Sequence, residues 1–199
     1  MPSRSTISFT LCGGALLGAC GLGGGAPVQG TAEEEALRQA DNLEVSAAAP
    51  PQQFTAYITG YSYWDNTPAR SAEIALPVIH QTAGGEGTYA DPITLAVGYA
   101  IVDGEARLDV PAGTRFYLQR LRKYAIVEDV CGDGPNPQNG PCHIGYTGHP
   151  WFDLYVGGAD ITAQKADACS RSITALQTVV MNPAPDLPVS AGGLAETAC

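Results

Sequence analysis

Basic residues are scarce in this 199-residue chain. It has 10 Lys and Arg residues against 20 Asp and Glu residues, which gives a formal net charge of -10. A chain this acidic is repelled by nucleic acid and by anionic lipid headgroups. We therefore expect no nucleic-acid partner, whereas a neutral polysaccharide, or peptidoglycan bound through local contacts, is compatible with the charge.

Metal-ligand spacings are also missing. The chain has 3 His and 6 Cys residues, and none of them forms a close Cys-x-x-Cys or His-x-x-x-His pair. Structural zinc sites use such pairs. No internal repeat is evident. We expect the protein to bind no metal and to need no cofactor.

Long apolar runs are absent as well. Residues 7–18 are too short to span a bilayer and follow a leader that has Arg4 and no acid, which is typical of a signal peptide. Residues 17–20 (LGAC) are similar to the cleavage box of bacterial lipoproteins. The alternative is an ordinary secretory signal beside a chance cysteine. We predict a signal peptide over residues 1–19 and a lipidated Cys20.

Residues 20–51 have the composition of a tether. A glycine run opens this segment and an Ala/Pro run closes it, so it is flexible at first and stiffer later. Between these runs, residues 33–45 can form a short acidic helix. The membrane contact is then made only through acyl chains on Cys20. By similarity to lipoprotein sorting signals, the lack of Asp after Cys20 favours the outer membrane of a Gram-negative cell. We expect an exported monomer anchored there, on the periplasmic or the cell-surface side.

Cysteine usage fits export to an oxidising compartment. With residues 1–19 removed and Cys20 acylated, the cysteines that remain are Cys131, Cys142, Cys169 and Cys199. Three connectivities are possible. We favour Cys131–Cys142, which closes a loop rich in Gly, Pro and Asn, and Cys169–Cys199, which ties the last residue to the domain.

Short segments rich in β-branched and aromatic residues dominate the domain, which we place at residues 52–182. Gly- and Pro-rich turns separate these segments, which argues for a closed barrel or a sandwich. A helix is expected over residues 161–168, opened by Asp160. Residues 183–199 indicate a Pro/Gly-rich tail tied by Cys199. The predicted strands are residues 54–61, 93–102, 115–118, 124–130, 151–156 and 174–181.

The strand at residues 151–156 sets one carboxylate among aromatic and apolar residues. Strand alternation places Trp151, Asp153 and Tyr155 on one face, and the other face has the character of core. A carboxyl group that is partly shielded from water beside Trp and Tyr should have a raised pKa. A proton donor for glycosidic-bond cleavage needs that property. The alternative is that Asp153 caps a turn or pairs with an Arg.

Five short motifs follow one another along the domain: FTAY at 54–57, LAV at 95–97, PAGT at 111–114, EDVCG at 128–132 and FDLY at 152–155. In order and spacing they resemble the 3D-domain family and the related C-terminal part of membrane-bound lytic transglycosylase A. The family is named for three aspartates. This chain supplies two of them, Asp129 and Asp153, while Gly98 stands where the first is expected.

A second set of motifs consists of YWD at 63–65, FDL at 152–154 and the Gly pair at 157–158. These resemble glycoside hydrolase family 45 and the expansins, although the dense cysteine pattern of that hydrolase family is missing. Residues 66–89 have no obvious counterpart in the 3D domains. The resemblances imply a mainly β fold: a six-stranded double-psi β-barrel of the barwin/endoglucanase type with one or two short helices.

The resemblances also imply catalytic roles. Asp153 is the acid in every enzymatic version. In the hydrolase version Asp65 is the base that activates water. In the lytic transglycosylase version the 6-hydroxyl of the sugar attacks, Asp153 serves as acid and then base, and Asp129 tunes its pKa or positions the substrate. The local alternatives are that Asp129 binds backbone near Cys131 and that Asp65 is a turn residue.

Several aromatic residues are candidates for stacking on sugar rings, although a small barrel also needs an aromatic core. They are Tyr61, Tyr63, Trp64, Trp151 and Tyr155. We interpret the sequence as an exported lipoprotein that cleaves a cell-wall-type polysaccharide, either peptidoglycan or a β-glucan. The alternatives are a non-hydrolytic, expansin-like module that binds glycan, and a structural lipoprotein that has lost activity.

Overall fold

The computed structural model describes residues 49–132 and 134–199. These residues belong to one compact unit, which spans Ala48–Cys199 and includes the predicted tail. The predictions for the signal peptide, for the lipidated Cys20 and for the acidic helix of the tether lie outside the described residues.

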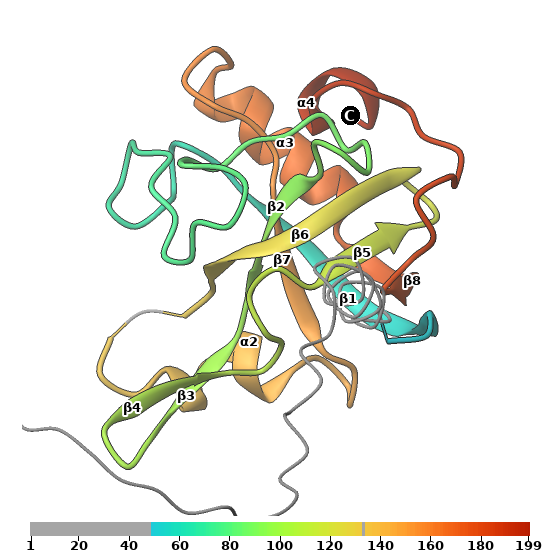
Figure 1. Cartoon of the computed structure of the whole chain (residues 1–199). Helices are drawn as coiled ribbons and strands as arrows, with labels where there is room; N and C mark the ends of the chain where they lie inside the picture. Colours follow the sequence, from blue (N-terminus) through green and yellow to red (C-terminus); the bar gives the residue numbers. More distant parts are fainter. Residues whose placement is uncertain (1–48, 133) are drawn as a thin grey trace, which may run out of the picture. The chain divides into compact units, whose positions relative to one another are not determined.

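Six strands close into a barrel (Figure 1) in the order β1-β7-β2-β6-β5-β8. Strand β1 runs parallel to β7, and β2 runs parallel to β6, while the other neighbouring pairs are antiparallel. This arrangement is compatible with a double-psi barrel. The strands are β1 Gln52–Tyr61, β2 Ile93–Val97, β5 Arg115–Leu118, β6 Lys123–Val130, β7 Trp151–Tyr155 and β8 Ala175–Met181.

The predicted mainly β fold is confirmed, and the barrel interior explains why these segments are strands. Inward side chains such as Ile58, Leu95, Phe116 and Leu154 are almost completely buried. Apolar and β-branched residues that alternate along a pleated strand put one face into such a core. The strand predicted at residues 115–118 has the bounds that the structure gives it.

The strand predicted at residues 93–102 is wrong as a single element. It breaks at Gly98 into β2 and a separate strand β3 (Tyr99–Val102), which pairs with β4 (Glu105–Leu108) in a two-stranded hairpin. A Cβ atom at Gly98 would lie 2.4 Å from Oδ2 of Asp109 and 2.6 Å from the Cys142 carbonyl. Only glycine fits this close approach, and the hairpin leaves the barrel on the side away from α3 (Figure 1).

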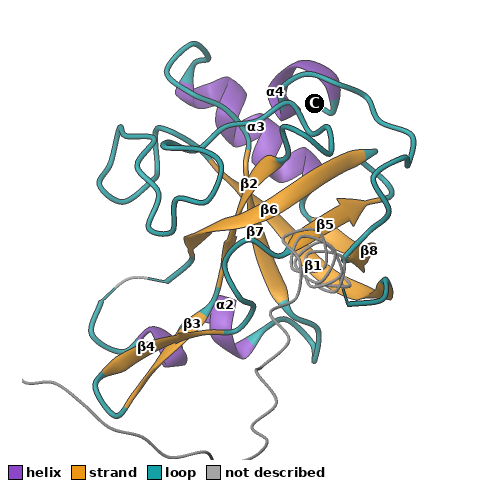
Figure 2. Ribbon diagram, in the orientation of Figure 1, coloured by secondary structure: helices purple, strands orange, loops and turns teal. Residues whose placement is uncertain are grey.

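The helices are short (Figure 2), and the structure places them differently from the sequence prediction. Helix α3 covers Ala163–Ile173, and Thr162 rather than Asp160 caps it by accepting a hydrogen bond from the Lys165 amide. The helix predicted at residues 161–168 corresponds to α3, and three further single-turn segments had no predicted position. The elements are the 3-10 turn η1 (Pro137–Asn139), α2 (Pro141–Ile144), α3 and α4 (Leu194–Thr197).

None of the helices within residues 49–132 and 134–199 has the length and apolar character needed to cross a lipid bilayer.

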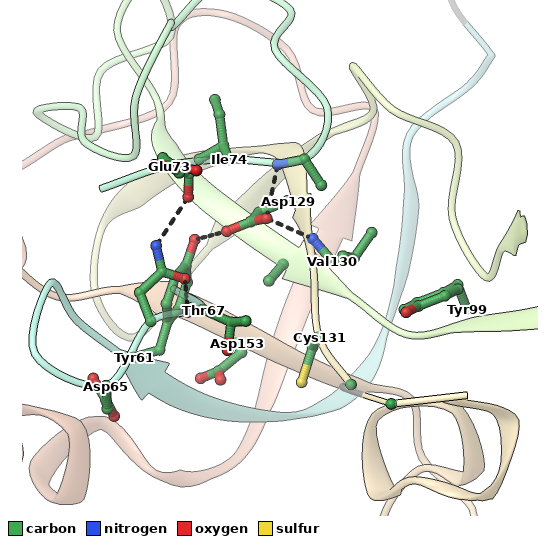
Figure 3. A pocket seen from close by; sticks show the side chains of 15 residues that line it. Tyr61, Asp65, Thr67, Glu73, Ile74, Tyr99, Asp129, Val130, Cys131 and Asp153 are labelled. Atoms are coloured by element: carbon green, nitrogen blue, oxygen red, sulfur yellow. Dashed lines mark hydrogen bonds between the residues drawn. The ribbon is translucent and has the colours of Figure 1, made fainter. Parts of the chain in front are cut away.

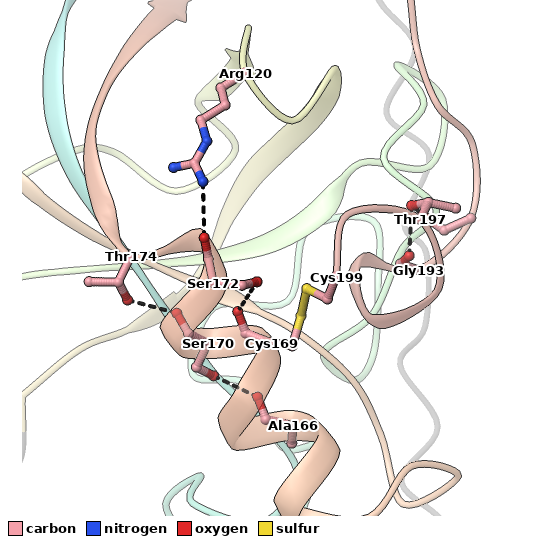
Figure 4. Close-up of a disulfide and its surroundings, with 10 residues drawn as sticks. Arg120, Ala166, Cys169, Ser170, Ser172, Thr174, Gly193, Thr197 and Cys199 are labelled. Atoms are coloured by element: carbon pink, nitrogen blue, oxygen red, sulfur yellow. Dashed lines mark hydrogen bonds between the residues drawn. A yellow bond between two sulfur atoms is a disulfide. The ribbon is translucent and has the colours of Figure 1, made fainter.

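Two disulfides cross-link the domain, with the connectivity favoured from the sequence. Cys131 is bonded to Cys142, with 5.8 Å between their Cα atoms, and Cys169 to Cys199, with 5.1 Å. The second disulfide joins α3 to the last residue beside α4 (Figure 4). Cross-links of this kind stabilise a small domain chiefly by restricting its unfolded chain.

The tail is held by more than its final cysteine. Lys123 on β6 is fully buried, and its ammonium group donates hydrogen bonds to the carbonyls of Glu86, Ser190 and Gly192. Tyr117 donates to the Pro188 carbonyl. Residues 183–199 therefore form part of the folded domain.

Candidate functional site

A row of four residues crosses the barrel wall from β6 to β1. Ala96 on β2 pairs with Asp129 on β6 and with Asp153 on β7, and Asp153 pairs in turn with Thr59 on β1. Two strand spacings separate the two aspartates, or about 10 Å between their backbones. The methyl group of Ala96 lies between them, which leaves room between the two carboxyl side chains.

These carboxyl groups line a cavity of about 360 Å³. Figure 3 shows Asp129, Asp153 and Tyr61 close together, with Asp65 at the side. Segment 62–92, which contains no described helix or strand, supplies one wall through Asp65 and Glu73. Other described residues that line the cavity are Asn66, Thr67, Ile74, Ala75, Ala96, Tyr99, Val130, Cys131, Gly132 and Gly134.

Asp153 is held by a chain of hydrogen bonds from the neighbouring strands. The indole N–H of Trp151 donates to Oγ1 of Thr59 (2.7 Å), and the Thr59 hydroxyl donates to Oδ1 of Asp153 (2.8 Å). Burial raises the pKa of Asp153 to about 7. That value already includes smaller upward contributions from the charges of Asp65 and Asp129 and the opposing effect of the Thr59 hydrogen bond.

Asp129 is almost completely buried and accepts three hydrogen bonds. Oδ2 accepts from the Tyr61 hydroxyl (2.8 Å), and Oδ1 accepts from the backbone amides of Ala75 (3.0 Å) and Val130 (2.9 Å). Burial raises the pKa of Asp129, and these three donors reduce that rise. The hydrogen bond from the Ala75 amide also holds segment 62–92 against the barrel. Asp129 therefore has a structural role in addition to any role in chemistry.

Asp65 occupies a turn at the rim of the cavity. Its Oδ1 accepts hydrogen bonds from the backbone amide of Ser62 (2.8 Å) and from the Ser62 hydroxyl (2.6 Å). None of the described residues donates a hydrogen bond to its Oδ2. The predicted turn role is therefore present, together with one carboxylate oxygen that has no described hydrogen-bond donor.

The aromatic residues proposed for sugar stacking are divided among several places. Tyr61 lines the carboxylate cavity, whereas Tyr63 and Tyr155 line a second one. Trp64 packs against the core and donates its indole N–H to the Ile161 carbonyl. Trp151 packs edge-on against Tyr57. Tyr155 was expected on the exposed face of β7 and is instead buried, because its ring packs against Tyr61 at 5.4 Å.

Sequence reasoning missed Thr59, Glu73 and Tyr99, the last two of which line the carboxylate cavity. Thr59 was within reach of the sequence argument. It stands two positions before Tyr61 in a predicted strand, and strand alternation places both residues on the face that carries the site. Glu73 lies in a segment without periodicity, so no local pattern points to it.

No group of three or more His, Cys, Asp or Glu residues in the described part of the chain is arranged to hold a metal ion. The carboxylates of the cavity are instead engaged by hydroxyl and amide donors. The arrangement suits proton transfer by Asp153, with Asp129 and Asp65 as neighbouring negative charges.

Comparison with known proteins places the chain in a family. Residues 53–199 match the family described as the DDB_G0273701 N-terminal domain. An "uncharacterized protein DDB_G0273701/DDB_G0273221" of Dictyostelium discoideum is 39% identical over 129 residues, which cover 64% of this chain and 49% of that relative. The chain thus spans about half the length of this curated relative. No solved structure matches the chain. By the extent of the family match, the chain belongs to the DDB_G0273701 N-terminal domain family.

Proposed function

We propose that this protein cleaves a β-linked polysaccharide of the cell-wall type, with Asp153 as the proton donor to the leaving oxygen. One observation carries the proposal. Asp153 has its pKa raised to about 7 and lines a cavity that also holds Asp65 and Asp129. Glycosidic cleavage uses a carboxyl group that keeps its proton near neutrality together with a second, ionised carboxylate in the same site.

The hydrogen bonds of Asp153 indicate which oxygen carries the proton. An indole N–H can only donate, so Thr59 accepts from Trp151 and directs its own hydrogen to Oδ1 of Asp153. The other acceptor near Thr59, the Phe152 carbonyl, lies farther away at 3.5 Å. Oδ1 is thus held as an acceptor. The proton then belongs on Oδ2, which no described residue engages by a hydrogen bond, and from Oδ2 it passes to the glycosidic oxygen.

The second group of the reaction is better supplied by Asp65 than by Asp129. Asp129 is buried and its two oxygens already accept three hydrogen bonds. Asp65 lines the cavity and has one oxygen with no described donor. A water molecule bound at that oxygen would be activated for attack on the sugar. Asp129 then acts by its charge, which favours the protonated form of Asp153.

The charge of the cavity supports a neutral substrate. The described lining residues include Asp65, Glu73, Asp129 and Asp153 and no Lys, Arg or His. An anionic polymer would be repelled there, so a glucan or an N-acetylated amino-sugar polymer fits better than a uronic-acid polymer. The double-psi topology of the glycan-active barrels, export through residues 1–19 and anchoring through Cys20 belong to the same proposal.

Product analysis tests the proposal. The purified protein is incubated with peptidoglycan and with a panel of β-1,4 glucans, and products are read by mass spectrometry. Asp153→Ala is the test variant, and Asp167→Ala, which changes an exposed carboxylate on α3, is the matched control. New reducing ends lost only in Asp153→Ala support hydrolysis with Asp153 as the acid, and their loss in Asp65→Asn as well would support Asp65 as the base. Products ending in 1,6-anhydro sugars would instead assign a lytic transglycosylase. Failure to cleave any polymer would overturn the enzymatic proposal in favour of expansin-like binding.

A further inference from the structure

A second cavity of about 430 Å³ lies next to the carboxylate cavity. The two linings meet at three places. Tyr61 of the first cavity packs its ring against Tyr155 of the second, with 5.4 Å between ring centroids. Residues close together in the chain also line different cavities. Tyr63 lines the second and Asp65 the first, and Ala72 lines the second and Glu73 the first. The two cavities are therefore neighbours in the fold, with the Tyr61 and Tyr155 rings in contact between their linings.

One residue of the second cavity's lining, Tyr155, has a buried hydroxyl with no hydrogen-bond partner in the described part of the chain. Tyr155 as a whole is 5% exposed. A Cβ atom on Gly158, which also lines the cavity, would lie 3.7 Å from that hydroxyl. Burial raises the pKa of Tyr155 to about 12, so its phenol keeps a proton to donate. An unsatisfied buried hydroxyl is unfavourable until it finds a partner.

The remaining walls are mostly apolar and suit a small ligand without negative charge. Tyr63 offers a half-buried aromatic ring, and Ala83 and Leu194 add apolar surface. Asp160 is the one charged residue among the described residues of this lining, so an anionic ligand is disfavoured. An apolar surface with a few placed polar groups is the usual composition of a small-molecule site, and the volume falls within the usual range.

Two glycines of the lining, Gly84 and Gly193, border open space. A Cβ atom at Gly84 or at Gly193 would meet nothing within 4 Å, so larger side chains fit there without a clash at Cβ and would extend into open space. Gly193 belongs to the C-terminal tail and lies near the Cys169–Cys199 disulfide, where its carbonyl accepts from Thr197 (Figure 4). The disulfide and the Lys123 contacts thus hold the tail as one wall of this cavity.

We propose that the second cavity binds a neutral sugar unit of the same glycan, adjacent to the unit held at the carboxylate cavity, with the Tyr155 hydroxyl as a hydrogen-bonding partner. This inference rests on the proposed function, because that function supplies the polymer. It assigns Tyr155, Gly158 and the tail to substrate binding, and it predicts that a longer oligosaccharide binds more tightly than a disaccharide.

The test uses the full chain with Asp153→Asn, so that ligands are not cleaved. Soluble β-1,4-linked oligomers of glucose and of N-acetylglucosamine, with two and with six units, are titrated while ¹H–¹⁵N spectra are recorded. We expect the six-unit ligand to shift the amide signals of Gly84, Gly158 and Gly193. Binding without any shift at these glycines would overturn the inference and leave the proposed function standing.

Variants make the test independent of the spectra. Tyr155→Phe removes a hydroxyl that bonds to no described residue, so the fold keeps its stability, and we expect binding of the six-unit ligand to weaken about five- to tenfold. Gly193→Leu extends into the cavity and should weaken binding at least as much. Tyr89→Phe, a half-buried tyrosine outside both linings, is the matched control. Unchanged affinity in both test variants would overturn the inference, and binding of no saccharide at all would overturn it together with the proposed function.

Discussion

The hydroxyl of Thr59 lies 2.8 Å from Oδ1 of Asp153 and receives the indole N–H of Trp151 at 2.7 Å. The hydrogen bond from Thr59 favours the ionised form of Asp153, against the burial that favours the protonated form. Thr59→Val keeps the shape of the side chain and removes the donor. We expect the pKa of Asp153 to rise above its present value of about 7, and carboxyl ¹³C titration by NMR measures it.

The control for that prediction is Thr59→Ser, which keeps the hydroxyl and should keep the pKa of Asp153 near 7. A purely structural role for Thr59 predicts the opposite pattern. Ser would then disturb the fold through the lost methyl group, and Val would leave the titration of Asp153 unchanged. The readout needs no catalytic activity, so it stands even where no polysaccharide is cleaved.

Asp153 should also reduce stability at alkaline pH. Its pKa is raised from 3.8 to about 7 in the folded protein, so the folded state binds the proton more tightly than the unfolded state. The contribution to stability is complete below the unfolded pKa and is lost as pH rises through about 7. Asp153→Asn removes a charge that burial disfavours, and at pH 8 it should raise the free energy of unfolding by roughly 1–3 kcal/mol. Urea denaturation at pH 5 and pH 8 checks this, and an equal effect at both pH values would contradict it.

The strands of the barrel could be predicted because their signals are local. Residues 115–118 and 124–130 are dense in aromatic and β-branched side chains, and the structure places β5 and β6 there. The β3–β4 hairpin also had a local signal in the sequence, the pair Asp103-Gly104. Both residues adopt positive φ at the turn. Asp-Gly between two short strands favours that turn. At the strand break the local signal was Gly98 itself, but its cause, packing against Asp109 and Cys142, is not encoded locally.

Some residues of the candidate site could likewise be predicted from the sequence, and others could not. The order of the motifs led to Asp65, Asp129 and Asp153, which the fold brings to one cavity. The expected surface position of Tyr155 depended on strand alternation, and Trp64 was a candidate for stacking with a core role left open. In the structure Trp64 donates its indole N–H to the Ile161 carbonyl, and Tyr155 packs on Tyr61. Both contacts join segments far apart in the sequence, so no local pattern encodes them.

A second pH-dependent element lies in segment 62–92, where His80 sits between two carboxylates. Its Nδ1 is 2.6 Å from Oε2 of the buried Glu128, and its Nε2 is 2.7 Å from Oδ1 of Asp91. Burial alone would lower the pKa of His80, but the two carboxylates outweigh it and the net shift is upward. The stability that charged His80 contributes is therefore present below about pH 6.5 and is lost as pH rises through its folded-state pKa.

Replacing His80 by Asn should remove that pH dependence. The variant leaves buried Glu128 with its backbone donors from Ile79 and His80 but without the imidazolium. We expect it to destabilise the protein by about 1–3 kcal/mol at pH 6 and by less at pH 9. His149→Asn, at a half-buried histidine with no ion pair in the described part of the chain, is the control. Thermal unfolding at both pH values gives the comparison, and a pH-independent loss in His80→Asn would show that the imidazole acts by packing alone.

Lys123 links the tail directly to strand β6 of the barrel. It is fully buried, and its ammonium group donates to the carbonyls of Glu86, Ser190 and Gly192. Burial lowers the pKa of Lys123, and the nearby charges of Glu196 and Glu86 oppose that shift. Lys123→Met keeps the length of the side chain but leaves the carbonyls without this donor. Each unsatisfied buried group costs about 1–3 kcal/mol, so we expect a loss of roughly 2–4 kcal/mol in the free energy of unfolding.

The same substitution at Lys165, an exposed residue on α3, is the matched control and should change stability by less than about 0.5 kcal/mol. Hydrogen exchange locates the effect. The Ser190 and Gly192 amides donate to the Arg122 and Glu86 carbonyls in the folded protein, and in Lys123→Met they should exchange faster than amides of β5 and β6. Equal acceleration throughout the barrel would mean that Lys123 supports the core as a whole. Selective acceleration would mean that it fastens the tail, which forms one wall of the second cavity.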